Sequence, residues 1–142
     1  MKTILIVDEE SKLTNLFRLV FPEDMDYRVV RVSSGIEAIL KSREIEPDVV
    51  IADVSLLDKD GYQLSKQLKN IPDLKNSYVI LLISSLKSEK ANSLKHSVDD
   101  LILKSSDPRD TLEDVIESMQ LLITQSEESN KSKRRENKIF PA

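Results

Sequence analysis

The sequence predicts an α/β fold in which five parallel strands form one sheet with helices on both faces. Short apolar runs alternate with stretches at helical spacing five times along the 142 residues, without an internal repeat. The strand-like runs are continuously apolar rather than alternating, which is typical of strands covered on both faces. A β-α alternation of this kind favours a parallel sheet with right-handed crossovers.

The five predicted strands are short and end abruptly. The first is TILIV, which stops at an acidic run, and the fourth is YVILLI, which stops at two serines. The strands are predicted at residues 3–7, 29–32, 49–52, 78–83 and 101–103.

The helices between the strands follow from apolar residues three and four positions apart. The last helix has the clearest start, because Asp107 is a capping residue and Pro108 suits the first helical position. The other helices are predicted at residues 11–21, at residues 35–43, after Gly61, and, as a weak polar helix, at residues 89–95.

Composition excludes many functions. The chain has no Cys, which excludes thiolate metal sites and thiol catalysis, and His96 is its only histidine. Its two glycines, Gly35 and Gly61, are too few for a Walker A loop or a GxGxxG fingerprint. There is no apolar run of 18 residues and no signal peptide, so we expect a cytoplasmic protein without a membrane partner.

Charge divides the chain into two parts. Residues 1–125 carry a net charge of −6, which argues against direct nucleic-acid binding, and residues 126–142 carry +2. Residues 126–142 also lack apolar periodicity and are rich in Ser, Glu, Lys, Asn and Arg. We therefore predict one domain over residues 1–125 and a disordered polar and basic tail or linker over residues 126–142.

Polar side chains follow four of the five predicted strands. Asp8 and Glu9 follow the first, Asp53 the third, Ser84 the fourth and Lys104 the fifth. In an open α/β sheet, ligands bind beyond the carboxyl ends of the strands, so we expect these groups to converge at one rim. Carboxylates suit Mg²⁺, and Asp53, after the middle strand, is the best-placed nucleophile for forming an aspartyl phosphate.

Four segments in this order resemble the receiver domain of two-component response regulators. They are ILIVDEE, DVVIADVSLLDKDGYQL, VILLISS and DDLILK, and the resemblance covers roughly residues 2–125. It implies a flavodoxin-like (βα)5 three-layer sandwich with a five-stranded parallel sheet. It also implies that a partner histidine kinase phosphorylates Asp53, that Ser84 is a switch hydroxyl and that Lys104 contacts the phosphate.

The resemblance further implies a Mg²⁺ ion as cofactor. Its ligands would be Asp8, Glu9, Asp53 and the backbone carbonyl of Ser55.

The sequence departs from the family pattern at several positions. Leu57 and Ser105 stand where the family usually has Pro, and Leu101 stands where it has a switch aromatic. Ser85 replaces the usual Ala, and residues 96–98 read His-Ser-Val in place of a small Gly-Ala pair. We therefore expect a weak or altered rotamer-coupled switch.

The leading hypothesis is a phosphoacceptor, not an enzyme, with slow self-dephosphorylation left open. Its partners would be a histidine kinase or phosphotransfer protein and a downstream protein target, with homodimerisation as one route of output. Two alternatives remain: a non-phosphorylated pseudo-receiver that acts as an interaction scaffold, and the N-terminal receiver fragment of a larger regulator with a missing effector domain.

Overall fold

The sheet has the predicted class and topology. The computed structural model describes residues 2–20, 26–54, 61–84 and 98–139. Its five strands are all parallel and lie in the order β2-β1-β3-β4-β5, which is the flavodoxin-like order. The strands are β1 (Lys2–Val7), β2 (Tyr27–Val32), β3 (Val49–Asp53), β4 (Tyr78–Ile83) and β5 (Asp100–Leu103).

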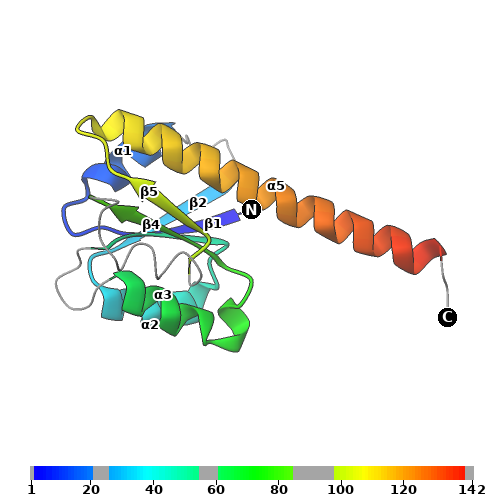
Figure 1. Cartoon of the computed structure of the whole chain (residues 1–142). Coiled ribbons are helices and arrows are strands. Elements are labelled where there is room, and N and C mark those ends of the chain that lie inside the picture. The colour runs from blue at the N-terminus through cyan, green and yellow to red at the C-terminus, as the bar shows by residue number, and fades with distance from the viewer. Residues whose placement is uncertain (1, 21–25, 55–60, 85–97, 140–142) are drawn as a thin grey trace.

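Helices cover both faces of this sheet, as Figure 1 shows. α1 and α5 pack together on one face, and α2 and α3 pack together on the other. The three-layer arrangement is therefore confirmed, whereas the predicted helix at residues 89–95 lies outside the described residues. The described helices are α1 (Lys12–Val20), α2 (Gly35–Ile45), α3 (Gly61–Lys69), α5 (Pro108–Ile139) and a 3₁₀ turn, η1 (Pro72–Leu74).

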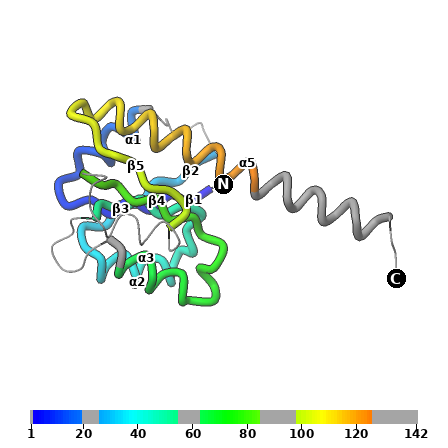
Figure 2. The backbone as a smooth tube through the Cα atoms, viewed as in Figure 1, coloured from blue at the N-terminus to red at the C-terminus, as the bar shows by residue number. Residues whose placement is uncertain are grey.

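The core has two layers, one on each side of the central strands. Figure 2 shows these strands between α1 and α5 on one side and α2 and α3 on the other. Alternate residues of β1 point to opposite layers, so that Ile4 and Ile6 pack with α1 and α5 while Leu5 and Val7 pack with α2 and α3. β3 and β4 repeat this division. Burial on both faces explains why these strands are continuously apolar in sequence.

The last helix is longer than the sequence analysis predicted. α5 continues to Ile139, so its helical backbone extends into residues 126–142, the segment predicted as a disordered tail or linker. The prediction of disorder rested only on the lack of apolar periodicity in this segment. Adding residues to a helix that is already nucleated costs much less free energy than nucleating a new helix. No Gly or Pro interrupts the chain between Arg109 and Ile139. Among the described residues, no helix combines the length and apolar composition that crossing a bilayer requires.

Candidate functional site

The carboxyl ends of β1, β3 and β5 open into one cleft of about 380 Å³. Asp8, Glu9, Asp53 and Lys104 all line this cleft. The predicted convergence of the strand-end groups is therefore observed for these four residues. The start of α5 forms a further wall of the cleft.

Backbone hydrogen bonds extend the sheet just past its strands and fix the site residues. Asp8 N donates to the Val32 carbonyl (3.0 Å), which ties the end of β1 to β2. Lys104 N donates to the Ile83 carbonyl (2.8 Å), which ties the end of β5 to β4. The site side chains therefore start from backbone that belongs to the rigid sheet rather than to free loops.

The centre of the cleft is an ion pair between Asp53 and Lys104. Lys104 Nζ donates to Asp53 Oδ2 at 2.5 Å, and the two side chains are 37% and 30% exposed. An ion pair at this exposure contributes about 1 kcal/mol or less to stability. Its importance is positional, because it places a cation directly on the carboxylate that sequence analysis singled out.

Asp8 is held in the cleft by hydrogen bonds from its own loop and from α1. Its Oδ2 accepts from both the backbone N–H and the hydroxyl of Thr14 at 3.4 Å, and its Oδ1 accepts from Glu10 N at 3.2 Å. The loop turns back toward Asp8 at Ser11, which has a left-handed backbone (φ 65°). The carboxylate is thereby oriented before any ligand arrives.

Glu9 lies on the outer side of the same loop. Its side chain is exposed at the cleft, and its backbone carbonyl accepts a hydrogen bond from Arg31 Nη2 at 2.9 Å. Arg31 belongs to β2, so this bond fixes the acidic loop to the neighbouring strand.

Of the two remaining predicted site residues, only Ser84 is among the described residues. Ser84 directly follows β4 with an exposed side chain, and it is not among the described residues that line the cleft. Ser55 lies outside the described residues, as do Leu57, Ser85 and the two residues before Val98. The described backbone contains no cis peptide bond, including the bond between Lys104 and Ser105.

The cleft offers carboxylate oxygens, the ligands that Mg²⁺ prefers. Among the described residues, no three His, Asp or Glu side chains form a group that could hold a metal ion by themselves. Mg²⁺ does not require such a group, because it commonly binds through one or two carboxylates together with waters and phosphate oxygens. Asp8 and Asp53 supply two carboxylates in one cleft, so the donor set fits Mg²⁺ bound together with a phosphoryl group.

Two buried hydroxyl groups that were not predicted from the sequence support the site. Thr14 is fully buried and contacts Asp8, and Thr111 is 4% exposed and accepts a hydrogen bond from Ser105 N at 2.9 Å. The signal for both was a threonine on the inward face of an amphipathic helix, where an apolar residue is the usual choice. A buried hydroxyl at such a position needs a partner, and here the partners are site residues or their neighbours.

Sequence comparisons identify relatives of the whole domain. The model of the response regulator receiver domain matches residues 4–116. The alkaline phosphatase synthesis transcriptional regulatory protein PhoP of Bacillus subtilis is 32% identical over 111 residues, which are 77% of this chain and 45% of that protein. The chain spans less than half the length of several such curated relatives.

Solved structures agree with the sequence matches. The Mn²⁺-bound form of response regulator Rcp1 has a TM-score of 0.67 at 25% identity, covering 81% of this chain and 89% of that one. The phosphorylated cyanobacterial phytochrome response regulator RcpA has the same fold, with a TM-score of 0.74 at 24% identity over 87% of this chain and 95% of that one. The match over residues 4–116 contains all four residues that line the cleft at the strand ends, and the protein belongs to the response regulator receiver domain family.

Proposed function

We propose that Asp53 accepts a phosphoryl group from the phosphohistidine of a histidine kinase or phosphotransfer protein. The observation that carries this proposal is the contact of Lys104 Nζ with Asp53 Oδ2 inside a cleft that Asp8 shares. A cation held beside a carboxylate, with further acidic oxygens close by, suits a phosphoryl group that must be neutralised and oriented.

The transfer is a nucleophilic substitution at phosphorus. An Asp53 carboxylate oxygen attacks the phosphorus, and the new O–P bond forms as the P–N bond to histidine breaks. The imidazole leaves with the electron pair of that bond. Lys104 then moves from the carboxylate to an oxygen of the phosphoryl group, where it offsets the added negative charge.

Receiver domains generally bind Mg²⁺. In this protein we assign Asp8, Glu9 and Asp53 as side-chain ligands, with the Ser55 carbonyl as a backbone ligand that lies outside the described residues. When bound, the ion supplies positive charge to the phosphoryl oxygens. Thr14 orients Asp8 for this role, since its N–H and hydroxyl both donate to the carboxylate oxygen Oδ2.

Output is proposed to occur by contact with a downstream protein or with an effector domain, in the cytoplasm. Phosphorylation replaces one negative charge on Asp53 by about two and adds acceptor oxygens, which draw in Lys104 and the Ser84 hydroxyl. Leu101 packs, partly buried, against the layer formed with α2 and α3. Because it is aliphatic, it has no polar end to move between buried and exposed positions, so we expect weak coupling through this residue.

A pseudo-receiver scaffold is the alternative function. In that case the Lys104–Asp53 ion pair is a permanent structural contact, and the protein acts through its surface without phosphorylation. The phosphoacceptor and the scaffold are both compatible with a receiver that belongs to a larger regulator. Phosphorylation of Asp53 is the feature that distinguishes the two functions.

Fluorine NMR of beryllofluoride, a phosphoryl mimic, tests the proposal directly. We expect bound-fluoride resonances in the wild-type protein with millimolar Mg²⁺ and their loss without Mg²⁺. Asp53→Asn should abolish them because it removes the coordinating carboxylate. Asp73→Asn, which changes an exposed carboxylate on η1, should retain them and serves as the matched control.

A wild-type protein that gives no bound resonance at millimolar Mg²⁺ overturns the phosphoacceptor proposal and leaves the scaffold function. The same holds if the Asp53→Asn variant gives the wild-type resonances.

A further inference from the structure

The segment that carries Lys104 is hydrogen-bonded to the beginning of α5. The bond from Lys104 N to the Ile83 carbonyl ties the end of β5 to β4. Among the described backbone hydrogen bonds, the next N–H, that of Ser105, donates to no strand carbonyl. Thr111 Oγ1 accepts this N–H at 2.9 Å. The peptides on both sides of the Lys104 α-carbon are therefore hydrogen-bonded.

The hydroxyl of Thr111 is placed for this bond rather than for packing alone. Thr111 is 4% exposed and lines the wall of the cleft that contains Asp53 and Lys104. Valine would fill the same volume, but it would leave the Ser105 N–H without its acceptor. Such a donor exists only because residue 105 is not proline, which has no backbone N–H.

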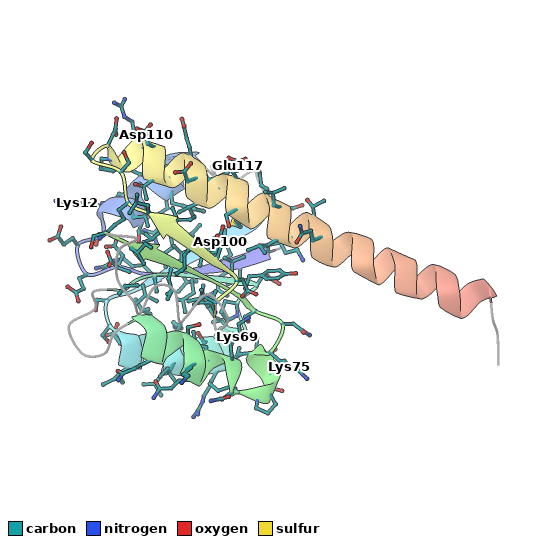
Figure 3. All side chains as sticks on the ribbon, in the orientation of Figure 1. Lys12, Lys69, Lys75, Asp100, Asp110 and Glu117 are labelled. Carbon is teal, nitrogen blue, oxygen red and sulfur yellow. The ribbon has the colours of Figure 1, made fainter. Side chains whose placement is uncertain are left out.

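Further bonds hold the same turn together. Ser105 Oγ accepts from Asp107 N at 3.3 Å and donates to Asp110 Oδ2 at 3.5 Å. Asp110 lies at the beginning of α5, next to the connection from β5, in Figure 3. Thr111 supplies the only buried side-chain acceptor among these described bonds, so it is the one shielded from competing water.

Lys104 needs precise placement because its target is two strands away. β4 lies between β3, which carries Asp53, and β5, so the side chain must reach across about 10 Å of sheet. The lysine stem has four rotatable methylene carbons, and a small rotation at its α-carbon displaces the ammonium by much more. Fixing both flanking peptides removes that freedom from the backbone.

We propose that Thr111 is a positioning residue, whose buried hydroxyl fixes the peptide after Lys104 and so holds the Lys104 ammonium on Asp53. This inference rests on the proposed function for its consequence in phosphorylation, where Lys104 contacts the phosphoryl group. Its structural part concerns the free protein and is measurable without any phosphoryl donor.

The test compares Thr111→Val, Thr111→Ser and a matched control on the same helix. Ser118→Ala is the control, because Ser118 Oγ is also buried on α5 but donates to Asp100 Oδ2, away from Lys104. The first readout is the lysine ammonium ¹H–¹⁵N spectrum of the free protein at low temperature, with the Lys104 signal assigned by its absence in Lys104→Arg. The second readout is the beryllofluoride affinity at fixed Mg²⁺, and thermal unfolding reports stability.

We expect Thr111→Val to lose the slowly exchanging Lys104 ammonium signal and to weaken beryllofluoride binding roughly fivefold, the effect of one neutral hydrogen bond. Thr111→Ser should retain both because it keeps the hydroxyl. Ser118→Ala should lower the thermal midpoint but keep both the ammonium signal and the beryllofluoride affinity.

The proposal is overturned if Thr111→Val keeps the ammonium signal, or if Ser118→Ala loses it as well. If wild-type protein binds no beryllofluoride, the proposed function fails, while the ammonium spectra still decide the role of Thr111.

Discussion

At the start of α5, a carboxylate caps the helix and holds an arginine. Asp107 Oδ1 accepts from the backbone N of Arg109 (3.0 Å), and Asp107 Oδ2 accepts from its guanidinium (3.0 Å). The hydrogen bonds from the side chain and then the backbone of Arg109 lower the pKa of Asp107 below its usual value. The same contact raises the pKa of Arg109. α5 begins at Pro108, and the side chain of Asp107 caps it, so the helix start predicted from the sequence at these two residues is confirmed.

The lowered pKa gives Asp107 a pH-dependent contribution to stability. A carboxyl whose pKa is lower in the folded state stabilises the fold above its unfolded pKa of about 3.9, and the contribution disappears as the pH falls through the folded pKa. We therefore expect Asp107→Asn to be less stable than wild type at pH 7, with a difference that shrinks toward pH 3. Urea unfolding at both pH values measures this difference.

Asp114→Asn is the control for that measurement, since it removes an exposed carboxylate from the same helix beyond its first turn. It should not reproduce the pH-dependent difference. An Asp107→Asn effect of equal size at pH 7 and pH 3 would show that the charge of Asp107 plays no part.

The site residues divide into those that sequence reasoning found and those it missed. Asp8, Asp53 and Lys104 were predictable because parallel strands end at the same edge, so position along a strand determines position in space. Thr14 and Thr111 were not, because their hydrogen-bond partners depend on how α1 and α5 dock against the sheet. No local sequence pattern encodes that docking.

At the scale of elements, α5 combines a packed half and an extension. Its core side chains run from Leu112 through Met119 to Ile123, and no described side chain of α5 after Ile123 is in the core. The helical backbone nevertheless continues to Ile139. The packed half therefore belongs to the fold, and the predicted domain boundary at residue 125 remains a prediction.

Ending the chain after Gln125 tests this boundary. We expect the shortened protein to keep its thermal midpoint within about 2 °C, because no described core side chain is removed, while its helical circular dichroism falls. Met119→Ala in the full chain is the contrasting variant and should destabilise by about 2–5 kcal/mol, since it empties a fully buried position. A shortened protein as unstable as Met119→Ala would place residues beyond 125 in the domain.

The strands were more predictable than the helix ends. β4 has the bounds expected from sequence, because its six apolar residues lie between polar neighbours. β2 begins at Tyr27, two residues before the expected start, since Tyr27 and Arg28 pair with Lys2 and Thr3 despite weak apolar patterning. Strand pairing with β1, which the local sequence does not contain, decides this boundary.

For the molecule as a whole, the site and the core are parts of one sheet. The cleft residues follow directly from strands whose other residues form both core layers, so a ligand held in the cleft binds only the folded protein. Such binding stabilises the whole domain by mass action. At a ligand concentration one hundred times its dissociation constant, the gain is about 2.7 kcal/mol.

Beryllofluoride with Mg²⁺ should therefore raise the thermal midpoint of the wild-type protein by about 10 °C at that concentration, given about 4 °C per kcal/mol for a chain of this size. Differential scanning calorimetry measures the shift, and its dependence on ligand concentration gives the affinity. Asp53→Asn should show no shift beyond that of Mg²⁺ alone. Because an anion bound elsewhere on the surface would stabilise both proteins alike, an equal shift in the variant would mean that the ligand is not held at Asp53.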